Sequence, residues 1–218
     1  MLSRLPRRCI LPVVAGVLVM AACDDDDDDP IVPPQTETFS ATLASLNGST
    51  ATGTATFSVT GDQVVASVDV NGADTGTVIR QHVHVGGTCP TIATADTNAD
   101  GIIDGPEAVL VSGRILVPLD GDVTTQAGGA GSYPTSDSTG SYEYADTVSL
   151  TAMLADLTAA DPDTSDLFEK ITGNTIGIDA RVVAAYGVAD TVDLDSTVLA
   201  LPGLTPQQSL PIACGPVN

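Results

Sequence analysis

The stretch "TFSATLASLNGSTATGTATFSVTGDQVVASVDV", residues 38–70, decides the fold class of this chain. Its runs 38–46, 52–60 and 63–70 are rich in Val, Thr and Phe, and the turn-forming segments "NGSTA" and "GD" separate them. Within the runs apolar residues alternate with polar ones, as Phe39, Ala41 and Leu43 do in the first. A period of two is typical of half-buried strands, so the stretch predicts three antiparallel strands.

Further runs of strand character follow along the rest of the chain, at 77–85, 114–119, 141–150, 176–188 and 209–214. About eight strands at this spacing predict an all-β domain, a Greek-key antiparallel β-sandwich or barrel. One or two short helices interrupt the strands. Leucines and methionine spaced i, i+3, i+4 and i+7 over 150–157 predict one, and segment 163–174 predicts another turn or two.

The N-terminus has the layout of an export signal. Three arginines precede the apolar run 10–20, which is too short to span a bilayer comfortably, and small residues lead into Cys23. This segment resembles a bacterial lipobox, which implies that residues 1–22 are removed and that Cys23 is lipidated. The alternative is a plain signal peptide with an incidental cysteine. Either reading places the protein outside the cytoplasm, and the first anchors it to the cell envelope, on the periplasmic side or at the cell surface.

Residues 23–37 contain "DDDDDDPIVPPQ", which predicts a disordered, solvated tether in front of a single domain at 38–218. An acidic tail that buffers calcium is the weaker alternative. After Cys23 the chain has 4 basic and 28 acidic residues, a formal charge of −24. This charge excludes electrostatic binding of nucleic acid or anionic lipid. The expected partners are the membrane, through the lipid on Cys23, and a protein or glycan that the sequence does not identify.

Two cysteines, Cys89 and Cys214, remain once Cys9 leaves with the signal and Cys23 carries the lipid. Exported proteins fold in an oxidising compartment, so the two are predicted to form a disulfide. Two free thiols are the alternative.

A candidate calcium loop lies at 96–107, "DTNADGIIDGPE". Calcium prefers six to eight hard oxygen ligands, and the loop matches the EF-hand pattern at every ligand position, with Gly101 at the sharp turn. Ordinary turn chemistry is the alternative for such Asp, Asn and Gly residues. The flanking segments do not read as helices, so we expect an ion loop grafted onto a β-domain, with no helix pair to open. The expected ligands are Asp96, Asn98, Asp100, the carbonyl of Ile102, Asp104 and Glu107.

His82 and His84 are two residues apart on a predicted strand, so both rings should project from the same face and could hold one metal ion. Here the sequence resembles the copper/zinc superoxide dismutases. "QHVHVGGTCP" is similar to their His-x-His strand and the cysteine after it, and "SLPIACGPV" is similar to their C-terminal Ala-Cys-Gly segment. The secreted bacterial β-domains of the CHRD type share the opening strands and the His-x-His strand.

This resemblance implies a Greek-key β-sandwich, a Cys89–Cys214 bridge, and His82 and His84 at the positions of two copper ligands. The chain departs from the enzymes because it has only 2 histidines, and Tyr186 falls where a further one would be. The calcium sequence also replaces the zinc loop, and we hypothesise that it orders the loop beside the histidines as zinc does. We therefore expect calcium as the cofactor and no catalytic residues. Weak copper or zinc binding at His82 and His84 with dismutase-like activity is the alternative, and hydrogen-bonded, bracing imidazoles are the simplest role for the pair.

Overall fold

The computed structural model describes residues 35–123, 133–160 and 177–218. The predicted signal peptide, Cys23, almost all of the tether, and the predicted helical segment 163–174 lie outside these ranges. The first strand already begins at Thr36, two residues before the predicted start of the domain. Among the described residues, no helix has both the length and the apolar character that a membrane crossing requires.

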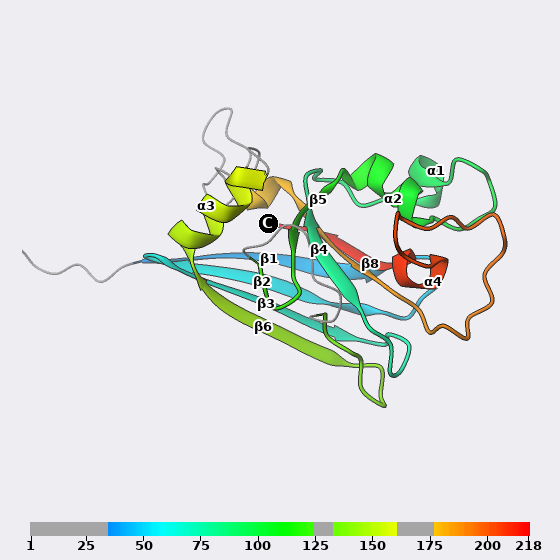
Figure 1. Cartoon of the computed structure of the whole chain (residues 1–218), viewed down its shortest axis with the longest axis horizontal. Coiled ribbons are helices and arrows are strands. Elements are labelled where there is room, and N and C mark those ends of the chain that lie inside the picture. The colour runs from blue at the N-terminus through cyan, green and yellow to red at the C-terminus, as the bar shows by residue number, and fades with distance from the viewer. Residues whose placement is uncertain (1–34, 124–132, 161–176) are drawn as a thin grey trace, which may run out of the picture. The chain divides into compact units, whose positions relative to one another are not determined.

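The described residues form one curled antiparallel sheet of eight strands, which confirms the predicted all-β class (Figure 1). The strand order is β5-β4-β7-β8-β1-β2-β3-β6. Strands distant in sequence therefore become neighbours: β3 pairs with β6, and β4 with β7. The strands are β1 (Thr36–Ser45), β2 (Thr52–Thr60), β3 (Gln63–Asn71), β4 (Arg80–His84), β5 (Ile115–Pro118), β6 (Tyr142–Ser149), β7 (Val182–Tyr186) and β8 (Pro211–Pro216).

The two halves of the sheet share one apolar core. Strands β1, β2, β3 and β6 form one half, and β5, β4, β7 and β8 form the other. The halves meet between β1 and β8, where Ala44 pairs with Cys214 and Ser45 with Ala213, and an isolated bridge joins Ala41 to Val217 beyond the end of β8. Phe57 from one half and Val83 and Val183 from the other belong to the same buried cluster, so the sheet curls around its own core.

Several predicted strands are shorter in the structure. The predicted strand 176–188 is reduced to β7, because its start forms a 3-10 turn at Ile178–Ala180. At its other end Gly187 adopts a positive φ of 126°, and a Cβ there would lie 2.7 Å from the carbonyl oxygen of Val78. The chain therefore turns out of the sheet immediately after Tyr186.

The helices are α1 (Ile92–Ala95), α2 (Gly105–Ser112), α3 (Leu150–Ala160) and α4 (Pro206–Ser209). Helix α3 is the predicted one, and Met153 and Leu157 bury its apolar side in the core. The expectation that no helices flank the ion loop was wrong, because α1 ends directly before Asp96 and α2 begins directly after Asp104. The reason is a capping box: Asp104 and Glu107 exchange hydrogen bonds across the first turn of α2, with Pro106 inside that turn.

Candidate functional site

The loop 96–107 is held in shape by hydrogen bonds from its own backbone to its acidic and amide side chains. Asp96 accepts from the backbone N–H groups of Asp100 and Gly101 at 3.2 and 2.9 Å. Asn98 Oδ1 accepts from Asp100 N at 3.0 Å, and Asp100 Oδ1 from Ile102 N at 2.9 Å. Gly101 has a φ of +86°, as the predicted sharp turn requires. The loop thus winds so that alternate side chains face inward.

Two carboxylates of this loop are buried. Asp104 is 2% exposed and Glu107 is 4% exposed. Glu107 Oε1 accepts from both the backbone and the hydroxyl of Thr97, at 2.7 and 2.8 Å, while Oε2 accepts from Asp104 N at 3.1 Å. Burial raises the pKa of Glu107, but the hydrogen bonds from Asp104, Thr97 and Asn98 outweigh it and bring that pKa below its ordinary value. The carboxylate is therefore stabilised as an anion.

Residues outside the loop clamp it in place, and sequence reasoning missed them. Asn47, in the turn between β1 and β2, donates to the carbonyl oxygens of Ile103 and Pro211 at 2.8 and 3.0 Å and accepts from Ile103 N at 2.8 Å. The N–H of Leu199 donates to Asp104 Oδ2 at 2.9 Å. The only sequence signal at Asn47 was the dipeptide Asn-Gly, which predicts a turn but says nothing of a contact 56 residues away.

The donor chemistry of this loop suits calcium, although the oxygens are not gathered into a ligand shell. All six predicted ligands offer oxygen atoms, and the sequence 96–107 contains no Lys or Arg to neutralise its four carboxylates. Within the described ranges, no three His, Cys, Asp or Glu side chains are arranged to hold a metal ion. The carboxylate oxygens instead receive N–H donors, so ion binding would draw the side chains of the loop closer together.

The two histidines lie on the same face of β4, as predicted, with Val83 between them facing the core. Neither contacts a loop carboxylate. The Nδ1 atom of His84 bonds the carbonyl oxygen of Gly113 at 2.8 Å, and its Nε2 atom bonds the Tyr186 hydroxyl at 3.0 Å. A carbonyl can only accept, so Nδ1 carries the hydrogen and Tyr186 donates to Nε2. His84 thus braces the end of α2, where Gly113 is the C-cap.

His82 is bonded at one nitrogen only. Its Nε2 atom lies 2.8 Å from the Tyr133 hydroxyl, while Nδ1 is buried and has no hydrogen-bond partner in the part of the chain that the structure describes. Burial lowers the pKa of His84 to about 4. Burial also lowers the pKa of His82 well below its ordinary value, with the charges of His84 and Arg80 acting in the same direction. Both rings are therefore neutral at pH 7.

The histidine pair does not fit a catalytic copper or zinc ion. Such sites use at least three protein ligands, and His84 already has both nitrogens in hydrogen bonds. Burial raises the pKa of Tyr186, so its hydroxyl remains protonated and is a poor metal ligand. Within the described ranges, the buried Nδ1 of His82 is the one nitrogen of the pair without a hydrogen-bond partner.

The predicted disulfide joins Cys89 to Cys214, with a Cα–Cα distance of 5.8 Å and a sequence separation of 125. It ties the segment before the ion loop to β8. Both cysteines pack in a small second core with Ala95, Ile103 and Tyr186. A disulfide of this kind is typical of proteins that fold outside the cytoplasm.

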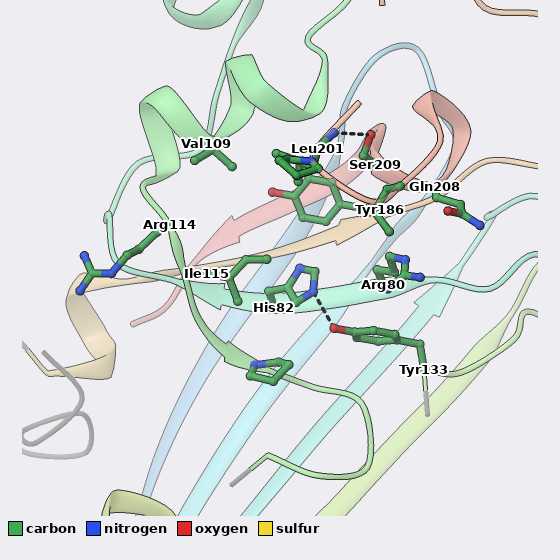
Figure 2. Close-up of a pocket in the computed structure, with 13 residues that line it drawn as sticks. Arg80, His82, Val109, Arg114, Ile115, Tyr133, Tyr186, Leu201, Gln208 and Ser209 are labelled. Atoms are coloured by element: carbon green, nitrogen blue, oxygen red, sulfur yellow. Dashed lines mark hydrogen bonds between the residues drawn. The ribbon is translucent and has the colours of Figure 1, made fainter. Parts of the chain in front are cut away.

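A pocket of about 380 Å³ opens over the outer face of β4 and β5, beside His82 (Figure 2). Helix α2 contributes Val109 to its wall, and the segment before α4 contributes Leu201 and Leu204. The polar lining comprises His82, Tyr133 and Tyr186, two arginines, Gln208 and Ser209. None of the described lining residues is acidic, although the chain has 28 acidic residues. Sequence reasoning missed this pocket.

No protein-family description matches the chain, and no curated protein sequence matches it. Among solved structures, the chain is similar to superoxide dismutase 5 of Candida albicans with Cu(II). The identity is 12%, the match covers 85% of this chain and 92% of that one, and the TM-score is 0.42. A likeness of this extent says nothing about the ligands or the activity of the present chain.

Proposed function

We propose that this chain is an exported, lipid-anchored, calcium-binding β-domain of superoxide dismutase-like or CHRD type, with a non-catalytic binding or structural role in the bacterial cell envelope. The observation that supports calcium most strongly is the burial of Asp104 and Glu107 in a loop with no basic residue. Two buried anions three residues apart repel each other, and a divalent cation offsets that repulsion. Lipidation of Cys23 holds the domain at the membrane through the acidic tether.

Calcium would order the wall of the histidine face through α2. This helix begins at the capping box of Asp104 and ends at Gly113, whose carbonyl holds His84. The same carboxylate of Asp104 also anchors Leu199 N, which lies in the segment that precedes the pocket residue Leu201. An ion at 96–107 therefore fixes both elements above the pocket. This role is structural, and it does not need the helices to open as they do in calcium sensors.

The experiment is elemental analysis of the domain from residue 36 for calcium, copper and zinc, followed by urea unfolding with and without calcium. We expect about one equivalent of calcium. With a Kd of about 0.1–1 mM and about 10 mM calcium, the free energy of unfolding should rise by about 1.4–2.7 kcal/mol. Glu107→Gln should abolish the rise, and the exposed β6 variant Glu143→Gln is the matched control. No calcium-dependent stabilisation in the wild-type domain would exclude the proposal.

The second candidate is a copper or zinc protein that uses His82 and His84. Only the unpartnered Nδ1 of His82 favours it. This candidate predicts one equivalent of copper or zinc in the same elemental analysis, and loss of that metal in His84→Ala without unfolding. Calcium alone would leave the first proposal standing.

A further inference from the structure

We infer that the pocket beside His82 binds a small organic carboxylate with an apolar body. The inference goes beyond the proposed function and does not require the calcium loop to bind an ion. It rests on three features of the pocket: a buried donor without a partner, a cation at its edge, and apolar walls.

The donor is the Nδ1–H group of His82. A phenol O–H is a stronger hydrogen-bond donor than the N–H of a neutral imidazole, so we assign the hydrogen of the Tyr133–His82 bond to Tyr133. The Tyr133 hydroxyl hydrogen then points to His82 Nε2, 2.8 Å away. A neutral imidazole that accepts at Nε2 carries its hydrogen at Nδ1. Among the described residues this hydrogen has no acceptor, and His82 is only 5% exposed. Figure 2 shows this nitrogen turned away from Tyr133, toward the side of the pocket where Tyr186 lies.

A buried N–H group without an acceptor is rare in folded proteins, because it has lost its bond to water. A ligand oxygen would supply the missing acceptor. The side chains of Ile115 and Leu201 line the pocket and are only partly buried, which leaves them room to move as the ligand enters.

The charge of the pocket favours an anion over a cation or a neutral ligand. Arg80 and Arg114 are two of the four basic residues that follow Cys23, and both line this pocket. The guanidinium of Arg114 points away from the other lining residues in Figure 2, so the argument rests on Arg80. The Arg80 guanidinium carbon lies 5.1 Å from the centre of the Tyr133 ring, whose hydroxyl group is hydrogen-bonded to His82. A carboxylate between Arg80 and His82 would receive a charge-assisted hydrogen bond.

The walls and the volume define the rest of the ligand. Val109, Leu201 and Leu204 are aliphatic, and about 380 Å³ lies within the range of small-molecule sites. A sugar or a phosphate ester would leave its polar groups unpaired against these walls. An aromatic or short aliphatic monocarboxylate satisfies the donor, the cation and the walls together.

The test is a titration of the calcium-loaded domain at pH 7 with benzoate and with benzyl alcohol, followed by amide NMR. Elemental analysis first verifies that the sample holds no copper or zinc. We expect saturable 1:1 binding of benzoate with a Kd of about 1 mM or tighter, with shifts at β4 and β5, and at least about tenfold weaker binding of benzyl alcohol. The titration is repeated without calcium, so failure of the ion loop and failure of the pocket are distinguishable.

Three variants sharpen the result. Arg80→Gln should weaken benzoate binding at least about tenfold and leave benzyl alcohol unchanged. Leu201→Trp should fill the pocket and abolish binding of both, with Leu204→Trp as the substitute if the first variant does not fold. Thr42→Val, on the exposed side of β1, should bind as the wild type does. Equal affinity for benzoate and benzyl alcohol, an unchanged affinity in Arg80→Gln, or shifts confined to other parts of the domain would each overturn the inference.

Discussion

The sequence separation of the two bridged cysteines sets how much the disulfide should contribute to the free energy of unfolding. The Cys89–Cys214 bridge spans 125 residues, most of the folded domain. In the chain-entropy treatment, a closed loop of this length removes about 16 cal/mol/K from the unfolded state, or about 5 kcal/mol at 25 °C. Reduction should therefore lower the free energy of unfolding by about 5 kcal/mol. With an m-value of about 2 kcal/mol/M for a domain of this size, the urea midpoint should fall by about 2.5 M.

The assay is urea unfolding of the wild-type domain, oxidised and fully reduced, at constant calcium. Reduced wild-type protein keeps both sulfur atoms, so it separates the cross-link from the cavity that alanine would create. Cys89→Ala with Cys214→Ala adds the loss of the buried Cys214 side chain, which is 3% exposed, and should be somewhat less stable than the reduced protein. A difference below about 1 kcal/mol between oxidised and reduced protein would refute the loop-closure reasoning.

Two further predictions concern His84 and Asn47. The pKa of His84 is about 4 in the folded chain and 6.5 ordinarily, so between these values the unfolded chain binds a proton that the folded chain does not. Stability should therefore fall as the pH is lowered, by about 2 kcal/mol between pH 7 and pH 5 from His84 alone. Urea unfolding at both pH values tests this, and an equally steep fall in His84→Gln would contradict it. Asn47→Ala removes three hydrogen bonds and places alanine at a φ of 52°, so it should cost about 2–4 kcal/mol and weaken calcium binding. Asn47→Gly, which tolerates that φ, should recover about 1 kcal/mol in the same unfolding assay, and a stability equal to that of Asn47→Ala would show that the backbone conformation contributes nothing.

The strands were predictable because their signal is local. Alternation in 38–70 gave β1, β2 and β3 nearly to the residue, since each strand buries one face against the common core. The prediction of strand boundaries was less accurate where both faces of a strand are buried. Every residue of β7 is buried, so alternation gives no boundary there, and the strand was predicted far too long.

Helices α1 and α2 were missed for a different reason. Helix α1 has four residues and α2 has eight, too few for a helical period to stand out from the sequence. Their stability comes from capping, and the residues that cap α2 are the same Asp104 and Glu107 that read as calcium ligands. The capping pattern, Asp104 and Glu107 three residues apart with Pro106 between them, is itself a sequence signal for a helix start, but interpreting these residues as calcium ligands left it unused.

The histidine face was predicted only in part, because its partners are scattered along the chain. His82 is hydrogen-bonded to Tyr133, which lies 51 residues further along the chain, and His84 to Tyr186, which lies 102 residues further along. Yet composition held an indirect signal. The chain has only 4 tyrosines and 2 histidines, and all of them are buried, so each rare ring is placed in the interior and none is left on the surface. Two of the tyrosines and both histidines gather on this face, with Arg80 beside them. Two of the buried tyrosines, His82 and the cation Arg80 therefore meet around one pocket, and this gathering is why we propose the carboxylate site there.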